Sequence, residues 1–150
     1  MRSMFSTLLI SLVTMLITSF SDHRQENTYS LTVEVKGLRN SEGVVQFALY
    51  NKNGSIPDEH FKKYLRLLKT EIKNGSASII FGNLPAGRYA VNIVHDENRN
   101  GKIDKGLLKP KEGIGFSNYV SIGLGNKPSF EKASFELDAD KSIAVKIIYM

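Results

Sequence analysis

The chain has 150 residues, of which 41% are hydrophobic and 23% charged, a balance typical of one globular domain with a substantial core. It has no cysteine, which excludes disulfides, thiol catalysis, thiolate metal sites and a lipid-modified N-terminal cysteine. The formal net charge of +5 comes from basic residues spread among acidic ones. Because no basic run is interleaved with aromatic residues, we expect no nucleic-acid partner.

The N-terminal residues 1–21 have the pattern of a secretory signal peptide. Arg2 gives a positive start, residues 4–17 form an apolar run interrupted only by Ser and Thr, and Ser19 and Ser21 are small residues at the positions that a signal peptidase reads. The alternative is a membrane anchor, although the run is short and rich in hydroxyl groups for a spanning helix. We expect cleavage near Ser21, a secreted or periplasmic protein, and no membrane span after cleavage.

Beyond the signal, residues 22–28 are polar and predict a flexible leader, so that residues 29–150 form a single domain. Alternation of apolar and polar residues predicts strands in this domain. The predicted strands are residues 29–36, 43–50, 67–73, 76–81, 88–95, 133–137 and 142–149. Asn74-Gly75 is a strong hairpin signal, and residues 82–87 predict a turn. About seven strands at this spacing predict an all-β fold, a Greek-key antiparallel β-sandwich.

At most one short helix is predicted. Asp58 could cap a helix that runs through about Leu65, because Phe61, Tyr64 and Leu65 have helical spacing. A longer helix that extends to Leu68 is an alternative.

Residues 96–130 predict a long irregular insertion, which in a compact domain usually has a function. It begins with a D-x-N-x-N-G-x-x-D motif made by Asp96, Asn98, Asn100, Gly101 and Asp104. Calcium takes 6–8 oxygen ligands, so a short loop must turn several oxygens inward, and Gly at the sixth position permits the sharp turn. The motif therefore predicts a calcium site.

Two further residues belong to this predicted site. Lys102, at the seventh position, would contribute only its backbone carbonyl, and Glu112 could supply a closing carboxylate. An EF-hand is excluded, because its twelfth position, here Leu107, requires Glu and because the preceding residues predict a strand. The alternative is an Asn-rich turn whose side chains bond their own backbone.

Four segments, residues 84–90, 95–104, 110–118 and 128–130, carry a family resemblance. Together they make the chain similar to a bacterial secreted family called domain of unknown function 2141, from about Tyr29 to Tyr149. The segment around residues 84–91 also resembles prealbumin-like modules of bacterial surface proteins, some of which bind calcium. The resemblance implies export and a prealbumin-like or Ig-like sandwich, and it implies no established activity.

Three functions are open. The first is an exported, non-enzymatic module whose long loop is ordered by calcium. The second is a module that binds a cell-envelope glycan, peptide or protein through exposed aromatic rings, unless those rings seal the sandwich instead. The rings concerned are Tyr89, Phe116, Tyr119 and Phe130. The oligomeric state does not follow from the sequence.

The third is a hydrolase. His95, Asp96, Glu112 and Ser117 could supply its groups, but Ser117 lies in no G-x-S-x-G elbow. We therefore assign no catalytic residue. For His95 the favoured interpretation is a half-buried side chain that bonds a neighbour, since a neutral imidazole is a poor calcium ligand.

Overall fold

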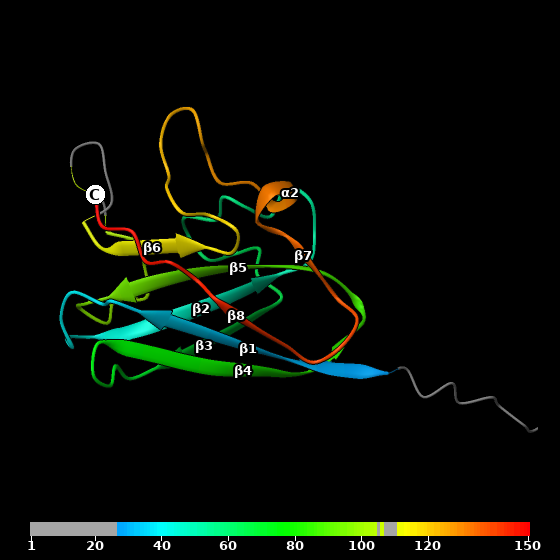
Figure 1. Ribbon diagram of the computed structural model, residues 1–150. Coiled ribbons are helices and arrows are strands. Elements are labelled where there is room, and N and C mark those ends of the chain that lie inside the picture. Colours follow the sequence, from blue (N-terminus) through cyan, green and yellow to red (C-terminus); the bar gives the residue numbers. More distant parts are fainter. Residues whose placement is uncertain (1–26, 105, 107–110) are drawn as a thin grey trace, which may run out of the picture.

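The structure, a computed structural model, describes residues 27–104, 106 and 111–150. Two β-sheets face each other across a hydrophobic core (Figure 1). The strands are β1 (Thr28–Lys36), β2 (Val44–Tyr50), β3 (Arg66–Thr70), β4 (Ser76–Pro85), β5 (Gly87–Asp96), β6 (Gly113–Phe116), β7 (Phe135–Leu137) and β8 (Lys141–Ala144), and the helix is α2 (Phe130–Ala133). The predicted all-β sandwich with at most one short helix is confirmed. The predicted signal peptide lies outside the described residues.

The first sheet has the strand order β4-β1-β8, and the second has the order β3-β2-β5-β6, with β7 paired to the beginning of β5. All pairs are antiparallel except one: β8 runs parallel to β1, with Val33 opposite Ile143. Both strands begin at the same end of the sandwich, because the chain returns from β7 to that end before it enters β8 (Figure 1). The parallel pair is a departure from the expected antiparallel pattern.

The core between the sheets contains the alternate residues that the sequence predicted to face inward. Val33 of β1, Phe47 of β2 and Ile93 of β5 are fully buried there. The outer face of the second sheet is covered as well, because connections from three parts of the chain and α2 lie over it (Figure 1). Tyr50 and Val94 are buried on that face. Strands β2 and β5 therefore have apolar surroundings on both sides.

The predicted helix at residues 58–65 is wrong, and so is its longer alternative. The Asp58 carboxylate does accept backbone N–H groups, from Lys62 at 3.0 Å and Lys63 at 2.8 Å, but only turns follow it. Phe61 has a φ of 49°, outside the helical region, and is buried against the outer face of the second sheet. Residues 66–70 pair with β2. The helix α2 instead follows Ser129, whose side chain accepts the Lys132 N–H.

The Asn74-Gly75 turn is confirmed. Both residues have positive φ angles, 51° and 69°, and Lys73 and Ser76 exchange two backbone hydrogen bonds of 2.9 and 3.0 Å. The strands on either side belong to different sheets, however, because β3 pairs with β2 while β4 pairs with β1. The turn therefore carries the chain from one layer to the other.

The insertion at residues 96–130 is less irregular than predicted, because β6 lies inside it and pairs with β5. The two glycines of β6 face the C-terminal segment of the chain. A Cβ atom on Gly113 would lie 2.4 Å from Tyr149 Cε1, and one on Gly115 would lie 2.3 Å from the Lys146 carbonyl oxygen. Ile114 and Ile148 exchange backbone hydrogen bonds of 3.0 and 2.8 Å. Glycine is therefore required for this close approach of the C-terminal segment.

Candidate metal site

The candidate site begins with Asp96, the last residue of β5, whose side chain is on the outer face of the second sheet. The residue is 1% exposed. Its Oδ1 accepts the Asn100 N–H at 3.0 Å and its Oδ2 accepts the Gly101 N–H at 2.8 Å, so the loop winds around this carboxylate. Gly101 has a φ of 73°, which suits glycine. The Lys69 ammonium of β3 lies 3.9 Å from Oδ2.

The two asparagines of the motif bond the loop itself. Asn98 Oδ1 accepts the Asn100 N–H at 3.0 Å, and Asn100 Oδ1 accepts the Lys102 N–H at 2.8 Å. Their amide nitrogens donate to the two oxygens of Asp104, at 2.6 Å from Asn98 and 2.9 Å from Asn100. These are the bonds expected of the Asn-rich turn, which was the alternative to a calcium loop.

Glu112, immediately before β6, closes the loop from the other side. It is 3% exposed, and its two carboxylate oxygens accept the Glu97 N–H at 3.2 Å and the Asp104 N–H at 3.1 Å. Burial raises the pKa of the Glu112 carboxyl above its ordinary value, and the nearby carboxylates of Asp104 and Asp96 raise that pKa further. Asp96, Asp104 and Glu112 thus lie near one another at the β5–β6 edge of the sheet.

The donor chemistry of this loop suits calcium, since every candidate ligand atom is an oxygen. Each carboxylate oxygen of Asp96 accepts a single hydrogen bond and keeps further lone pairs. Asp104 is different, because asparagine amides hold both of its oxygens. Within the described residues, no group of three or more His, Cys, Asp or Glu side chains has metal-ligating geometry as it stands. Asp104 would therefore have to exchange its amide partners for the cation.

An ion pair that the sequence analysis missed anchors the loop to the β1–β2 connection. Arg39 donates through Nε, at 2.7 Å, and through Nη2 to the two carboxylate oxygens of Glu97, and its guanidinium lies 4.7 Å from the centre of the Tyr149 ring. The hydrogen bond from Arg39 holds the pKa of Glu97 below its ordinary value. Gly43 of the same connection also packs closely against the loop, because a Cβ atom on Gly43 would lie 1.9 Å from the Asp96 carbonyl oxygen. No local sequence pattern connects these residues.

The residues considered for a hydrolase are not assembled into a triad. His95 is fully buried on the inner face of β5, with Nε2 2.9 Å from the Glu42 carbonyl oxygen and Nδ1 2.7 Å from the Tyr149 hydroxyl. We assign the N–H to Nε2, because a carbonyl oxygen can only accept, so Nδ1 accepts the tyrosine hydroxyl. Ser117 donates to the Ala133 carbonyl at 2.6 Å. His95 thus bonds a neighbour, as expected, and is buried more deeply than predicted.

The aromatic residues considered for an exposed binding platform are buried, so that interpretation is wrong. Tyr89 lies in the core between the sheets, whereas the other three rings belong to the cluster on the outer face of the second sheet. The rings are those of Tyr89, Phe116, Tyr119 and Phe130, all 3–5% exposed. They seal the protein interior, which was the alternative interpretation.

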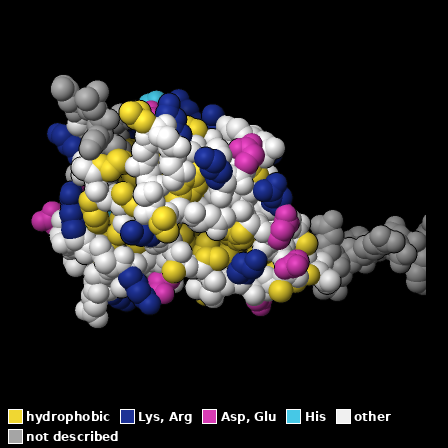
Figure 2. Space-filling model, turned by 45° about the horizontal axis from the view of Figure 1, so that its top comes forward, with side chains coloured by type: hydrophobic (Ala, Val, Ile, Leu, Met, Phe, Trp, Pro, Cys, Tyr) yellow, Lys and Arg dark blue, Asp and Glu magenta, His cyan; other side chains and the backbone are white. Residues whose placement is uncertain are grey.

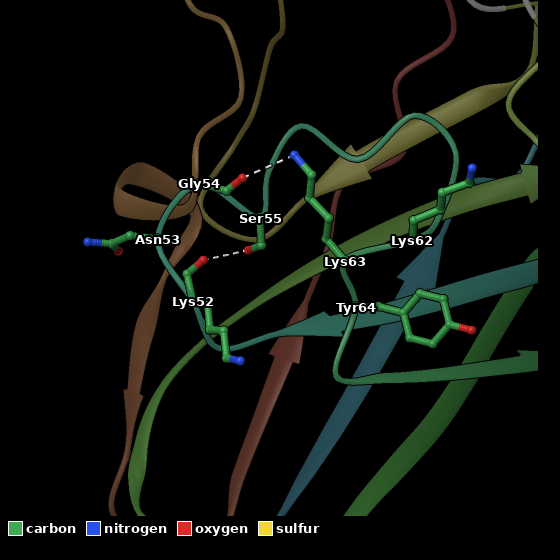
Figure 3. A pocket seen from close by; sticks show the side chains of 7 residues that line it. All are labelled: Lys52, Asn53, Gly54, Ser55, Lys62, Lys63 and Tyr64. Carbon is green, nitrogen blue, oxygen red and sulfur yellow. Dashed lines mark hydrogen bonds between the residues drawn. The ribbon is translucent and has the colours of Figure 1, made fainter.

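The surface offers charges of both signs. On the face shown in Figure 2, Lys and Arg side chains are interspersed with Asp and Glu. A cavity of about 390 Å³ between residues 52–55 and 62–64 is lined by three lysines, among other residues. Their ammonium groups do not converge: Lys52 and Lys62 point in different directions, and Lys63 donates to the Gly54 carbonyl at 3.3 Å (Figure 3). This cavity therefore lacks the geometry of an anion site.

No helix in the described part of the chain is long and apolar enough to span a membrane. Neither a curated protein nor a solved structure matches the chain. A family model with the description "Uncharacterized protein conserved in bacteria (DUF2141)" matches residues 33–145, which include most of the sandwich and the whole candidate metal loop. The chain therefore belongs to the DUF2141 family of uncharacterised bacterial proteins.

Proposed function

We propose that the protein is an exported, non-enzymatic β-sandwich module whose β5–β6 loop binds calcium, and that the cation holds this edge of the second sheet in place. The observation that supports the proposal is the gathering of three carboxylates, those of Asp96, Asp104 and Glu112, around one short loop. Export is supported by the signal-like pattern of residues 1–21 and by what the family resemblance implies.

The electrostatics favour a cation at this place. Asp96 and Glu112 are almost fully buried, and the one described cation in an ion pair with either is Lys69, at 3.9 Å from Asp96. Two carboxylates buried close together repel each other when both are ionised, and the charge of Asp96 is among the causes that raise the pKa of Glu112. A divalent cation would neutralise them, and the free energy of ligation would offset the conformational entropy lost by the loop.

Calcium binding requires one rearrangement of the loop, and it is opposed by one neighbouring charge. Asp104 turns from the asparagine amides toward the cation, and the Asn98 and Asn100 oxygens, the Lys102 carbonyl and Glu112 complete the oxygen set. The Lys69 ammonium repels a cation bound beside Asp96. A lysine charge a few ångströms from a divalent cation is repelled by about 1–2 kcal/mol in water and by more near a protein surface, so Lys69 should lower calcium affinity about fivefold or more.

Thermal unfolding of the purified protein in calcium and in chelator tests the proposal. A ligand present at about 100 times its Kd adds about 2.7 kcal/mol to the free energy of unfolding. For a domain of this size we expect the melting temperature to be roughly 10 °C higher in saturating calcium than in chelator. Equal melting temperatures in the two conditions would leave only the self-bonded Asn-rich turn, and the proposal would be wrong.

Two pairs of variants sharpen the test. Asp96→Asn keeps the size of the side chain but removes a ligand charge, so it should abolish the difference between calcium and chelator. Asp138→Asn, at an exposed acid in the turn after β7, should leave that difference unchanged. Lys69→Met should tighten calcium binding in a calorimetric titration, whereas Lys73→Met, at an exposed lysine in the β3–β4 connection, should not.

A further inference from the structure

A second cavity lies on the outer face of the second sheet, between the sheet and the connections that cover it. Its volume is about 320 Å³, at the low end of the range for small-molecule sites. Ile114 and Phe116 of β6 and Ile122 of the following loop give it apolar walls, and Ile103 adds another from the candidate calcium loop. Asn92 of β5 and Asp58 are among its polar residues.

Asn92 provides the decisive observation. It is 1% exposed, it lines the cavity, and its Oδ1 has no hydrogen-bond partner among the described residues. The neighbouring Tyr50 hydroxyl donates to Asp58 Oδ2 at 3.3 Å; burial raises the pKa of Tyr50, and the Asn92 side chain lowers it by a smaller amount, as a donor close to that hydroxyl would. Since Tyr50 uses its hydrogen on Asp58, the Asn92 amide nitrogen is the end of that side chain that suits the Tyr50 oxygen. The amide is therefore oriented, and its oxygen is the end left without a donor, which is costly for a buried polar atom.

The cavity wall on the solvent side is held in place without a ligand. The Tyr119 hydroxyl donates to the Lys127 carbonyl at 3.0 Å and accepts the Ser129 N–H at 3.1 Å, which fixes both sides of the loop that carries Ile122. The Asn118 amide donates to carbonyl oxygens of residues 132–134. The walls would therefore need little ordering by a ligand, whereas Asn92 Oδ1, which has almost no exposed surface, would have to shift toward it.

We propose that this cavity binds a small, uncharged molecule with an apolar body and a single hydroxyl or N–H donor, which Asn92 Oδ1 accepts. An uncharged ligand is favoured because the charged side chains that line the cavity, Asp58, Glu59 and Lys127, are of both signs, and the Asp58 carboxylate already accepts hydrogen bonds from Tyr50 and from two backbone N–H groups. An ionised group against isoleucine and phenylalanine walls would lose its water and would meet a side chain of its own sign as well as one of the opposite sign. This site goes beyond the proposed calcium loop and uses different polar atoms.

Two probes of the same shape test the donor requirement, indole and benzofuran, in which an oxygen replaces the N–H group. Full-length protein labelled with ¹⁵N is titrated with each probe, and amide chemical shifts are followed by NMR. Indole should bind saturably, with shifts at Asn92, Ile114 and Phe116. Benzofuran should bind about tenfold or more weakly, because its oxygen leaves Asn92 Oδ1 without a donor. The titrations are run in calcium and in chelator, so that a failure of the calcium proposal does not decide this one.

Three variants localise the effect. Asn92→Leu should bind indole and benzofuran equally. Gln46→Leu is the matched control, because Gln46 has an equally buried and unpartnered amide oxygen on the same face but does not line the cavity, and it should keep the preference for indole. Ile122→Trp fills the cavity from its half-buried rim and should abolish binding of both probes while the spectrum remains that of a folded protein.

Three results would overturn the proposal. They are the absence of saturable indole binding by the wild-type protein, a preference for indole that survives in Asn92→Leu, and full indole affinity in Ile122→Trp. If Asn92→Leu does not fold, the indole-to-benzofuran ratio in the wild-type protein and the loss of binding in Ile122→Trp decide the question.

Discussion

The substitution Gly115→Ala tests how closely the C-terminal segment lies against β6. A methyl group at this position would lie 2.3 Å from the Lys146 carbonyl oxygen and 3.0 Å from Ile93 Cγ1. The carbonyl belongs to the backbone, so no change of rotamer relieves the clash, and the segment must move away by about 1 Å. That movement would pull Ile147 out of the core and stretch the two hydrogen bonds between Ile114 and Ile148.

The cost follows from these contacts. Overpacking a core position against rigid neighbours costs about 1–3 kcal/mol. Two weakened backbone hydrogen bonds add about 1 kcal/mol each. The total of roughly 3–5 kcal/mol is a large part of the stability of a typical domain, about 5–15 kcal/mol. Gly115→Ala should therefore lower the midpoint of urea unfolding by roughly 2 M, given a slope of about 1–3 kcal/mol per M.

Gly123→Ala is the matched control, because a Cβ atom there would have nothing within 4 Å and the residue has no positive φ. Its stability should stay within about 0.5 kcal/mol of the wild type. Hydrogen exchange at the Ile114 and Ile148 amides should be faster in Gly115→Ala only. If the two glycine variants unfold at the same urea concentration, the close approach of the C-terminal segment to β6 is not present in solution.

Three further results are expected. In chelator, the raised pKa of Glu112 means that protonation of this carboxyl favours the folded protein. This contribution to stability is fully present below pH 4.5 and is lost as pH rises through the raised pKa. Glu112→Gln should therefore flatten the decline of stability in this pH window, measured by urea unfolding at several pH values. Tyr149→Phe removes the hydroxyl that donates to the buried His95 and should cost about 1–3 kcal/mol, against almost nothing for the exposed Tyr64→Phe. Gly75→Ala places a side chain at a φ of 69° and should lower stability by about 1–2 kcal/mol in thermal unfolding, unless the turn relaxes to another type.

The strands of the core could be predicted from the sequence because apolar side chains occupy the alternate positions that face the space between the sheets. β1 and β5 are of this kind, and Val33 and Ile93 point inward as expected. β6 could not be predicted, because glycine is unfavourable in an isolated strand. The need for glycine comes from the residues at 146–149, which contact β6 only in the folded chain. A long-range steric demand of this kind leaves no local pattern.

The error at residues 58–65 has a different origin. Helical spacing of Phe61, Tyr64 and Leu65 is weak information, because a turn can bury an aromatic ring equally well. Here only Phe61 is buried, while Tyr64 and Leu65 are 40% and 44% exposed, so no apolar helix face exists to be covered. The capping signal of Asp58 was real, since its carboxylate accepts two backbone N–H groups. A capping residue therefore indicates a turn and does not ensure a helix after it.

At the candidate site, the spacing of the motif was sufficient to bring Asp96 and Asp104 into one loop, and Glu112 joins them through backbone N–H groups. The partners that hold the loop from outside could not be predicted. Lys69 comes from β3 and Arg39 from the β1–β2 connection, and each is far from the motif in the sequence. A motif can specify the atoms of a loop, whereas the charges that tune those atoms depend on the arrangement of the sheet around it.

Ile103 joins the two proposed sites. It lies one residue before Asp104 in the candidate calcium loop, and it is also part of the cavity beside Asn92. Calcium that fixes the loop would therefore also fix one wall of the cavity, and a molecule in the cavity would hold the loop closer to its calcium-bound form. Linkage requires the two effects to be equal, so any factor by which calcium tightens the small molecule must also be the factor by which that molecule tightens calcium. The connection between β5 and β6 would then be the element through which a ligand in one proposed site changes the affinity of the other site.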